Sequence, residues 1–402
     1  MHSINSNLLT LILLSQLLYF HVLLVPVSAK VFISIDCGSS SLEPYTDTRS
    51  IVWVGDNQYV RTGEARSVIA NDIPDDWDSR VMSTLREFPT RSTNCYSIDV
   101  DDGKSEDSNK VERVLVRASF YYGNYDNKSV PPLFYLLFNG NEWDYVQTSM
   151  TGIVHKEVVY SLNQYGNTIT VCLFRLGRGT PFISALEVRS LDSDIYSYVD
   201  SNYPLIFMQR EAYGTNSIVR YPEDSCDRIW DPIGQLGNTS GLIKVRNTSP
   251  SIKIDINDDK VPEALFTTAT MLKNISETLW IISDNNNYEY PRLPRHFNLY
   301  FSEVIELNST QKRSFNITVY TYDDKDRFIT FRDYGPVIPP YGQALQFRIT
   351  NVTASKRYKI AVYATDDSNL PPLVNAFEVY TIGDELVQAT NSKDGTILFF
   401  FS

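Results

Sequence analysis

The amino-acid sequence predicts an all-β protein made of two tandem β-sandwich domains of the jelly-roll type. Short runs rich in β-branched and aromatic residues recur along the chain, which contains 26 tyrosines and 20 phenylalanines. Gly, Pro, Asn and Asp residues bound these runs at intervals of roughly ten residues, a spacing typical of sandwiches and jelly rolls. Long stretches with helical periodicity are scarce, and one motif occurs in both halves of the chain.

The first half contains the strand-like runs 31–36, 111–122, 133–138, 156–160, 168–176 and 182–188. Asn139-Gly140 lies between two of these runs and is a hairpin signal, because both residues tolerate the positive φ angles of a tight turn. Together the runs predict a first domain over residues 30–190.

The second half repeats the pattern with runs at 296–307, 315–322, 328–331, 345–350, 358–363 and 376–381. The halves also end alike, because Thr180-Pro-Phe-Ile-Ser-Ala-Leu-Glu-Val188 matches Pro371-Pro-Leu-Val-Asn-Ala-Phe-Glu-Val379. We interpret this match as duplication of one β-domain. A polar stretch rich in Ser, Asp and Tyr at 191–204 is the predicted linker, which places the second domain at 205–383 and a C-terminal tail at 384–402.

An apolar stretch from Leu8 to Ala29 precedes the first domain and ends in small residues. This pattern predicts a secretory signal peptide over residues 1–29, cleaved before Lys30. An uncleaved signal anchor is the alternative, because no Lys or Arg precedes the stretch and its length suffices to span a bilayer. The expected location is therefore secreted, or the extracellular face of the plasma membrane if the segment is retained.

Asn-x-Ser/Thr tripeptides support export, because such sites are glycosylated in the secretory pathway. They lie at Asn127, Asn238, Asn247, Asn274, Asn308, Asn316 and Asn351. Each is a predicted glycosylation site and a predicted surface position, since a glycan cannot be buried. Most of them fall in the second half, which should carry more glycan.

Charge and cysteine content exclude several classes of function. The 36 Lys and Arg against 48 Asp and Glu give a net charge of −12, which offers no attraction for nucleic acid. The cysteines are Cys37, Cys95, Cys172 and Cys226, and the sequence does not choose among their possible pairings. None has Cys-x-x-Cys spacing, so neither a zinc site nor a redox site is expected.

No pattern in the sequence predicts an enzyme. Beyond the signal segment the histidines are His155 and His296, which lie in strand-like runs where a structural role is the simpler interpretation. Neither Gly-x-Ser-x-Gly nor His-Glu-x-x-His occurs. The acidic run at 99–103 lacks the spacing of a calcium loop, with Lys110 where the bidentate Glu belongs. We expect no metal, no cofactor and no catalysis, although carboxylate pairs suited to glycoside cleavage stay open.

Several motifs follow one another in a distinctive order: Ile33-Ser-Ile-Asp-Cys-Gly38, Leu85-Arg-Glu-Phe-Pro89, Arg91-Ser-Thr-Asn-Cys-Tyr96, Leu115-Val-Arg-Ala-Ser-Phe-Tyr-Tyr-Gly-Asn-Tyr-Asp126, Arg220-Tyr-Pro-Glu-Asp224, Asp227-Arg-Ile-Trp230 and the 370–380 motif. With them, residues 31–382 resemble the malectin-like extracellular region of plant receptor kinases with leucine-rich repeats, including symbiosis-type receptors. The resemblance implies two malectin folds and a cell-surface role in sensing cell-wall glycans, peptides or co-receptors.

The chain departs from that family pattern in two respects. Family receptors continue into leucine-rich repeats, a membrane helix and a kinase, and none of these patterns occurs here. A truncated transcript of a receptor kinase is therefore a further hypothesis. Cys226 also stands where the family more usually has an aromatic residue.

The predicted carbohydrate-binding residues are Tyr121, Tyr122, Asn124, Tyr125 and Asp126. Aromatic rings can stack on the C–H faces of sugars, while Asn and Asp can pair with hydroxyl groups. The resemblance adds that aromatic residues at the end of the corresponding strand line the disaccharide site of the fold's founding animal member. It also implies a lost contact, because Gly179 occupies the place of an acidic sugar-binding residue. The alternative is that the tyrosines fill the core or the domain interface.

Two function hypotheses follow. The first is a non-catalytic module that recognises cell-wall carbohydrate, and the alternative is an ectodomain that binds a secreted peptide or a receptor-kinase ectodomain without binding sugar. The motif containing Asp227, Arg228 and Trp230 is predicted to cement the two domains, because an Arg between acidic and aromatic neighbours can form an ion pair and stack at once. In the second domain, the equivalent strand around Tyr300 is expected to belong to the core.

Overall fold

The computed structural model describes residues 31–387, apart from 70–72, 74–76, 101–112, 163–167, 234–240, 256–258, 283–291, 324, 326, 356 and the side chain of Asn351. The predicted signal peptide, the sequon at Asn238 and most of the predicted tail lie outside the described residues. The regular structure of the described residues consists of β-strands and two short 3-10 helical turns, which confirms the predicted all-β class. In this part of the chain, no helix has the length and apolarity needed to cross a membrane.

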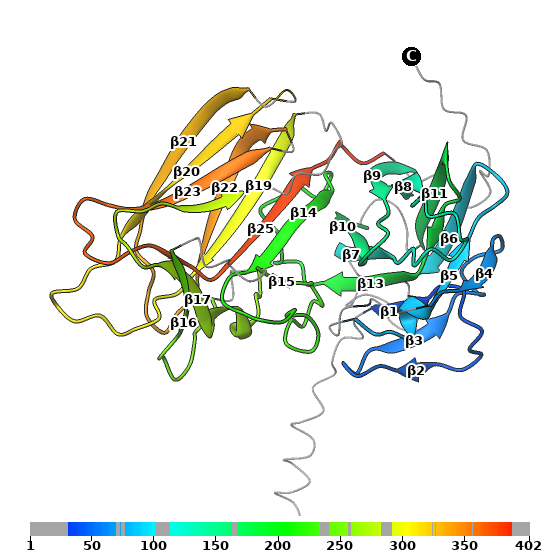
Figure 1. Ribbon diagram of the computed structural model, residues 1–402, viewed down its shortest axis with the longest axis horizontal. Coiled ribbons are helices and arrows are strands. Elements are labelled where there is room, and N and C mark those ends of the chain that lie inside the picture. The colour runs from blue at the N-terminus through cyan, green and yellow to red at the C-terminus, as the bar shows by residue number, and fades with distance from the viewer. Residues whose placement is uncertain are drawn as a thin grey trace, which may run out of the picture.

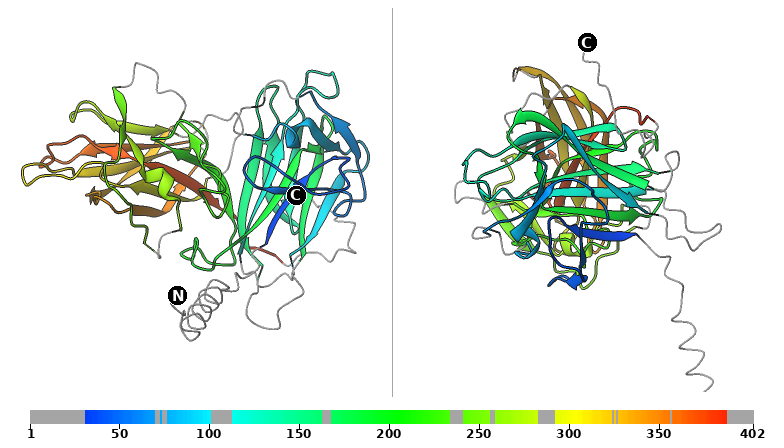
Figure 2. Two further views of the ribbon diagram at one scale, coloured as in Figure 1. Left: turned by 90° about the horizontal axis from the view of Figure 1, so that it is seen from below. Right: turned by 90° about the vertical axis from the view of Figure 1, so that its right-hand side faces the viewer.

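The first half is a sandwich of two main sheets with a small third sheet at one end (Figures 1 and 2). One main sheet contains β2 (Tyr45–Thr46), β3 (Val52–Gly55), β1 (Phe32–Asp36), β13 (Ala185–Leu191), β7 (Arg113–Phe120) and β10 (Val154–Ser161). The other contains β6 (Thr93–Asp99), β11 (Thr168–Arg178), β8 (Leu133–Phe138) and β9 (Asn141–Gln147). The small sheet contains β12 (Phe182–Ile183), β5 (Thr84–Glu87) and β4 (Glu64–Ser67), next to η1 (Val81–Ser83).

The second half has the same plan. Its strands in the large sheet are β14 (Leu205–Ala212), β15 (Asp231–Pro232), β25 (Ala376–Ile382), β19 (Leu293–Phe301) and β22 (Leu345–Ala354). The opposing sheet contains β18 (Leu279–Ile282), β23 (Tyr358–Ala364), β20 (Phe315–Tyr322) and β21 (Phe328–Val337). The small sheet contains β16 (Leu242–Arg246), β17 (Thr268–Leu272) and β24 (Leu373–Val374), with η2 (Glu263–Phe266) before β17.

The order of the strands shows that the two halves repeat one topology. The order β3-β1-β13-β7-β10 recurs as β15-β14-β25-β19-β22, and the first pair in each series is parallel. The order β6-β11-β8-β9 recurs as β18-β23-β20-β21, and β12-β5-β4 recurs as β24-β17-β16. The repeated terminal motif occupies β12–β13 in one half and β24–β25 in the other, so the sequence match corresponds to a match in three dimensions.

One continuous sheet joins the halves. Strand β10 of the first half pairs antiparallel with β14 of the second, with Val158 opposite Ile206 and Val159 opposite Leu205. In the second half, the equivalent of β10 is β22, which ends the sheet. Backbone hydrogen bonds therefore cross the junction and fix how the two sandwiches are oriented.

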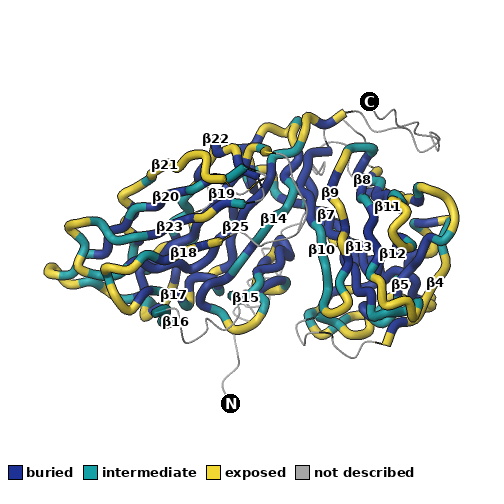
Figure 3. Tube along the Cα trace, turned by 45° about the horizontal axis from the view of Figure 1, so that its top comes forward, coloured by how far each residue is buried: buried dark blue, intermediate teal, exposed yellow. Residues whose placement is uncertain are grey.

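A separate hydrophobic cluster fills the junction. It combines Leu115 and Val159 of the first half with Leu205 and Tyr380 of the second. The predicted linker contributes Tyr196, which is fully buried. The predicted linker therefore contributes side chains to the core between the halves, and Figure 3 shows β10 and β14 side by side at this junction.

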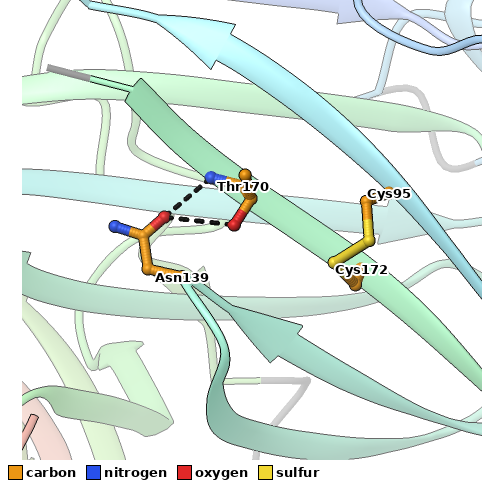
Figure 4. The surroundings of a disulfide bond; sticks show 4 residues. All are labelled: Cys95, Asn139, Thr170 and Cys172. Carbon is orange, nitrogen blue, oxygen red and sulfur yellow. Dashed lines mark hydrogen bonds between the residues drawn. A yellow bond between two sulfur atoms is a disulfide. The ribbon is translucent and has the colours of Figure 1, made fainter. Parts of the chain in front are cut away.

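The cysteines form one disulfide, between Cys95 on β6 and Cys172 on β11, which are directly opposite each other in the sheet (Figure 4). The turn between β8 and β9 is linked to β11 because Asn139 Oδ1 accepts hydrogen bonds from the backbone nitrogen and the hydroxyl group of Thr170. Cys37 and Cys226 are buried and are not joined by a disulfide.

We expect a thiol reagent to label no cysteine in the folded protein and two cysteines per chain after unfolding without reductant, namely Cys37 and Cys226. Peptide mapping of the labelled protein identifies the sites. Labelling of none or of all four cysteines after unfolding would contradict the pairing.

Candidate functional site

The loop predicted to bind carbohydrate does not present an aromatic platform. Tyr121 and Tyr122 directly follow β7, and their exposed fractions are 3% and 0%. The Tyr122 ring packs 6.2 Å from Phe182, and the half-buried Tyr125 ring lies 5.5 Å from the same residue. In this conformation neither Tyr121 nor Tyr122 can stack on a sugar, so the expectation for these two residues is wrong and their alternative role in the core holds.

The polar groups of the same loop are engaged with the loop itself. The Tyr122 hydroxyl donates to Asp126 Oδ1 at 2.5 Å, and the backbone nitrogen of Lys128 donates to the same oxygen at 3.2 Å. Partial burial works against the charged form, but these bonds lower the pKa of Asp126 below its usual value. Asn124 Oδ1 accepts from the backbone nitrogen of Ser129 at 2.8 Å. The side chains of Asn124 and Asp126 therefore form hydrogen bonds that hold the conformation of the loop.

Gly179, which the resemblance places where an acidic sugar-binding residue is expected, lies at a close approach of two backbone segments. Its φ angle is +84°, and a Cβ atom added there would lie 2.9 Å from Cβ of Pro132. A larger residue at this position would need both a strained backbone and a displaced proline. The backbone at this edge of the first half therefore requires glycine at position 179.

Asp227, Arg228 and Trp230 are all fully buried, but Trp230 packs with Phe266 and Tyr300 in a cluster of second-half residues, so the prediction that Trp230 joins the two domains is wrong. Asp227 accepts a hydrogen bond from Arg189 on β13 at 2.8 Å and also pairs with Arg117 on β7. Both strands belong to the first half, so the carboxylate of Asp227 bridges the two sandwiches. Arg228 is held by Asp224 at 2.8 Å.

A second buried chain of charges crosses the same junction. Arg210 on β14 pairs with Glu157 on β10 at 2.9 Å and with Glu378 on β25 at 3.1 Å. Burial disfavours the charged carboxylate, but Arg210 and then Arg117 outweigh it and lower the pKa of Glu157 to about 2. The fully buried charges are thus paired in opposite signs across the interface, as buried charges must be.

Sequence reasoning missed most of this network. The unpredicted members are Arg117, Glu157, Glu187, Arg189, Arg210, Arg220 and Glu378. One signal was available, because Glu187 and Glu378 occupy the same place in the repeated motif and each is flanked by apolar residues on both sides. Each pairs with buried arginines, which explains why an acidic residue stands at that position in both halves.

A small cavity of about 110 Å³ opens beside the junction. It is lined by Asp47, Thr48, Arg49, Trp53, Trp77, Asp78, Val81, Met82 and Arg220. Only Arg220 comes from the second half, and its guanidinium group lies 5.8 Å from the ring of Trp77. A volume of this size fits one side chain and is well below the roughly 300 Å³ of a typical small-ligand pocket.

The predicted glycosylation sites differ in their surroundings. Asn127, Asn274 and Asn308 are exposed, and Asn316 is half-buried on β20. Asn247 is 8% exposed, and its Nδ2 donates hydrogen bonds to the Phe266 carbonyl oxygen at 3.1 Å and to Ser302 Oγ at 3.3 Å. A glycan attached to that nitrogen would replace one of the two donated hydrogens and would need space at a buried position, so the structure contradicts the prediction for Asn247.

We expect Asn247→Gln to leave the total glycan mass of the secreted protein unchanged. The same substitution should lower the free energy of unfolding by about 1–3 kcal/mol, because the two buried acceptors lose their donor. Intact mass and urea titration measure the two effects. Asn308→Gln is the matched control and should remove one glycan while changing stability little. Loss of glycan mass in Asn247→Gln would show that this nitrogen is modified after all.

Comparison with known proteins gives one consistent picture. A model of the malectin-like domain matches residues 35–382. An uncharacterised protein of Arabidopsis thaliana is 34% identical over 381 residues, which cover 92% of this chain and 68% of that protein. A probable leucine-rich-repeat receptor-like serine/threonine-protein kinase of the same plant is 35% identical over 370 residues, covering 90% of this chain. The chain spans 40% of that kinase's length.

Solved structures share the fold at low sequence identity. The ANX2 ectodomain of Arabidopsis thaliana superposes with a TM-score of 0.68 at 16% identity, covering 90% of this chain and all of that one. The plant receptor-like kinase FER gives a TM-score of 0.65 at 18% identity, covering 91% and 98% of the two chains. The structure of the plant peptide RALF23 in complex with FER and LLG2 gives 0.64 at 17% identity, covering 90% and 96%.

Proposed function

We propose that this chain, which belongs to the malectin-like family, is a non-catalytic extracellular module that binds a secreted peptide or the ectodomain of another receptor. The observation that carries the proposal is its likeness, over 90% of its length, to a structure in which FER is complexed with the peptide RALF23 and LLG2. We propose further that residues 1–29 direct export and that the exposed sequons are glycosylated, so that the module works outside the cell.

The junction cavity supports a peptide more than a sugar as ligand. Its volume of about 110 Å³ matches one anchoring side chain, whereas a disaccharide needs a larger concave site. The burial of Tyr121 and Tyr122 removes the stacking surface on which the carbohydrate hypothesis depended. Recognition of cell-wall carbohydrate by the 121–126 loop is therefore not part of the proposal.

The proposal is tested by immobilising the secreted chain and measuring the binding of secreted plant peptides and receptor ectodomains, singly and in pairs, by biolayer interferometry. Thr48→Trp is designed to fill the cavity from its exposed rim and should weaken peptide binding at least about tenfold, because it occupies the anchor site. Thr151→Trp makes the same change at an exposed loop position outside the cavity and should bind normally.

Two outcomes would overturn parts of the proposal. If no peptide or ectodomain binds while soluble cell-wall oligosaccharides do, the carbohydrate hypothesis replaces the proposed function. If a peptide binds equally well to Thr48→Trp and to the unmodified chain, the function stands and the cavity is not the anchor site.

A further inference from the structure

The outer face of the sheet β18-β23-β20-β21 carries five aromatic side chains that we call the aromatic strip: Trp280, Tyr320, Tyr322, Phe328 and Phe331. The Trp280 ring lies 5.8 Å from Tyr320, which in turn lies 6.0 Å from Phe331. Trp280, Phe328 and Phe331 are 47%, 55% and 53% exposed. Figure 3 shows β21 as one of the most exposed strands of the second half.

The strip arises from strand alternation. On β20, Phe315, Ile317 and Val319 point into the core, so Asn316, Thr318, Tyr320 and Tyr322 point outward. Strand register then places Phe331 opposite Tyr320 and Phe328 opposite Tyr322. A contiguous aromatic surface of this kind is unusual on an exported protein unless something covers it.

Asn316 is a predicted glycosylation site on that same face. It stands opposite Tyr363 of β23, in line with Thr318, Tyr320 and Tyr322 along β20. Within the described residues its Nδ2 makes no hydrogen bond, in contrast to the doubly bonded Nδ2 of Asn247. The attachment atom of Asn316 is therefore available and lies beside the strip.

The surroundings of Asn316 leave room for a sugar. On the β21 side stands Gly335, where an added Cβ atom would lie only 3.0 Å from Asn316 Oδ1. Between Asn316 and the rings, Thr318 and its cross-strand partner Ala361 are each only 2% exposed, and the Thr318 hydroxyl group is hydrogen-bonded to Asp333 and Tyr363, so a sugar would pass over these polar neighbours. Tyr320 lies four positions further along the strand than Asn316, roughly 13 Å away, a distance that the core of an N-linked glycan can span.

We propose that the N-linked glycan of Asn316 lies along the aromatic strip, with the C–H faces of its sugars stacked on the rings. The point of attachment identifies this glycan as the group that covers the strip, because the glycan leaves the protein on the face that carries the exposed rings. The hydroxyl groups of Tyr320 and Tyr322 and the amine of Lys359, also on this face, supply hydrogen-bond partners for the sugar. The glycan is in this way an internal cover for the sheet, and the strip is not a docking surface for an external partner.

This inference depends on export and glycosylation but not on peptide binding, so the two proposals can fail independently. The chain has five tryptophans, of which Trp53, Trp143 and Trp230 are at most 3% exposed and Trp77 is half-buried. Trp280, at 47%, is by far the most exposed. Quenching of tryptophan fluorescence by acrylamide therefore reports mainly on the strip.

The test uses the glycosylated protein secreted from plant cells, with glycopeptide mass spectrometry to establish that Asn316 is occupied. Asn316→Gln should raise the quenching constant of Trp280 by roughly twofold, because it uncovers the ring. Asn308→Gln, which removes a glycan from an exposed turn, should leave quenching unchanged. Repeating each measurement with Trp280→Phe isolates the contribution of Trp280. If Asn316→Gln is not secreted, enzymatic trimming of the glycans on the folded wild-type protein gives the same comparison.

Three results would overturn the proposal. The first is an unmodified Asn316, and the second is an occupied Asn316 with the same Trp280 quenching before and after glycan removal. The third is protection of Trp280 only when soluble oligosaccharide is added or the protein concentration is raised. That result would assign the strip to an external glycan or to a second copy of the chain.

Discussion

Replacing Asp227 by asparagine is expected to lower the free energy of unfolding by about 3–5 kcal/mol. The carboxylate of Asp227 is fully buried and pairs with Arg189 and Arg220 at 2.7 and 2.9 Å. Burial alone would raise its pKa, but Arg220, Arg189 and Arg117 lower the pKa well below the usual value. An asparagine of nearly equal size keeps the packing but leaves the arginines with an uncompensated buried charge.

Urea titration followed by circular dichroism and by tryptophan fluorescence measures the loss. The wild-type chain should unfold with both probes coincident, because one sheet and one charge network join its halves. In Asp227→Asn the junction is weakened, so the transitions should also separate. Asp367→Asn is the control, because it breaks the exposed ion pair with Lys312 and should change nothing measurable. A variant at Asp227 as stable as the wild type would show that the network adds no stability.

Lowering the pH from 7 to 4 should destabilise the protein by about 3 kcal/mol for each of the two histidines His155 and His296. Burial lowers the pKa of His155 and of His296 to about 4. His155 is half-buried, with its ring stacked on Phe207 and tilted against Trp77, and its Nε2 has no hydrogen-bond partner in the described part of the chain. His296 is 1% exposed and stacked on Tyr198 at 4.3 Å.

The direction follows from proton linkage. In the unfolded chain a histidine binds a proton below about pH 6.5, whereas the folded protein resists protonation until about pH 4. The contribution of the histidines to the free energy of unfolding is therefore fully present above about pH 6.5 and falls between about pH 6.5 and 4. Below about pH 4 the histidines cause no further loss of stability. Glu157 and Glu378 near the two rings raise the pKa values, but not enough to offset burial.

The measurement compares the pH dependence of unfolding in the wild type and in His155→Phe/His296→Phe, which leaves no histidine after residue 29. Asp231 acts in the opposite direction, because burial raises its pKa to about 6, but it is present in both proteins and cancels in the difference. The histidine contribution is the gap between the two curves, which should widen by about 6 kcal/mol from pH 7 to 4. Parallel curves would mean that the histidines titrate normally in the folded state.

The fold could be predicted because the patterns that indicate it lie within short segments of the sequence and occur in both halves of the chain. The runs of β-branched and aromatic residues gave the strands, and the Pro, Ala, Glu and Val of the terminal motif recur in β12–β13 and β24–β25. The disulfide could not be predicted, since the pairing of Cys95 with Cys172 depends on which strand lies beside β6. Register between distant strands is not written in any local pattern.

The burial of Tyr121 and Tyr122 could not be predicted from the sequence, for a physical reason. Simple alternation would turn one of two adjacent tyrosines outward, yet Tyr121 and Tyr122 are both buried because the chain leaves the strand pattern after Phe120. The backbone nitrogen of Tyr121 bonds Ser184 Oγ at 3.1 Å, which holds the chain against the core at this point. The charge network was invisible for a related reason, because its members come from strands far apart in sequence and meet only through the junction between β10 and β14.

The continuous sheet has a mechanical consequence. Tandem domains usually meet through small polar interfaces and move about a hinge, and many receptors use such bending to report ligand binding. Here the pairing of β10 with β14 and the ion pair between Glu157 and Arg210 occupy the place of a hinge. The two sandwiches should therefore turn as one rigid body, so that a rotation imposed by a partner at one end is carried undiminished to the other end.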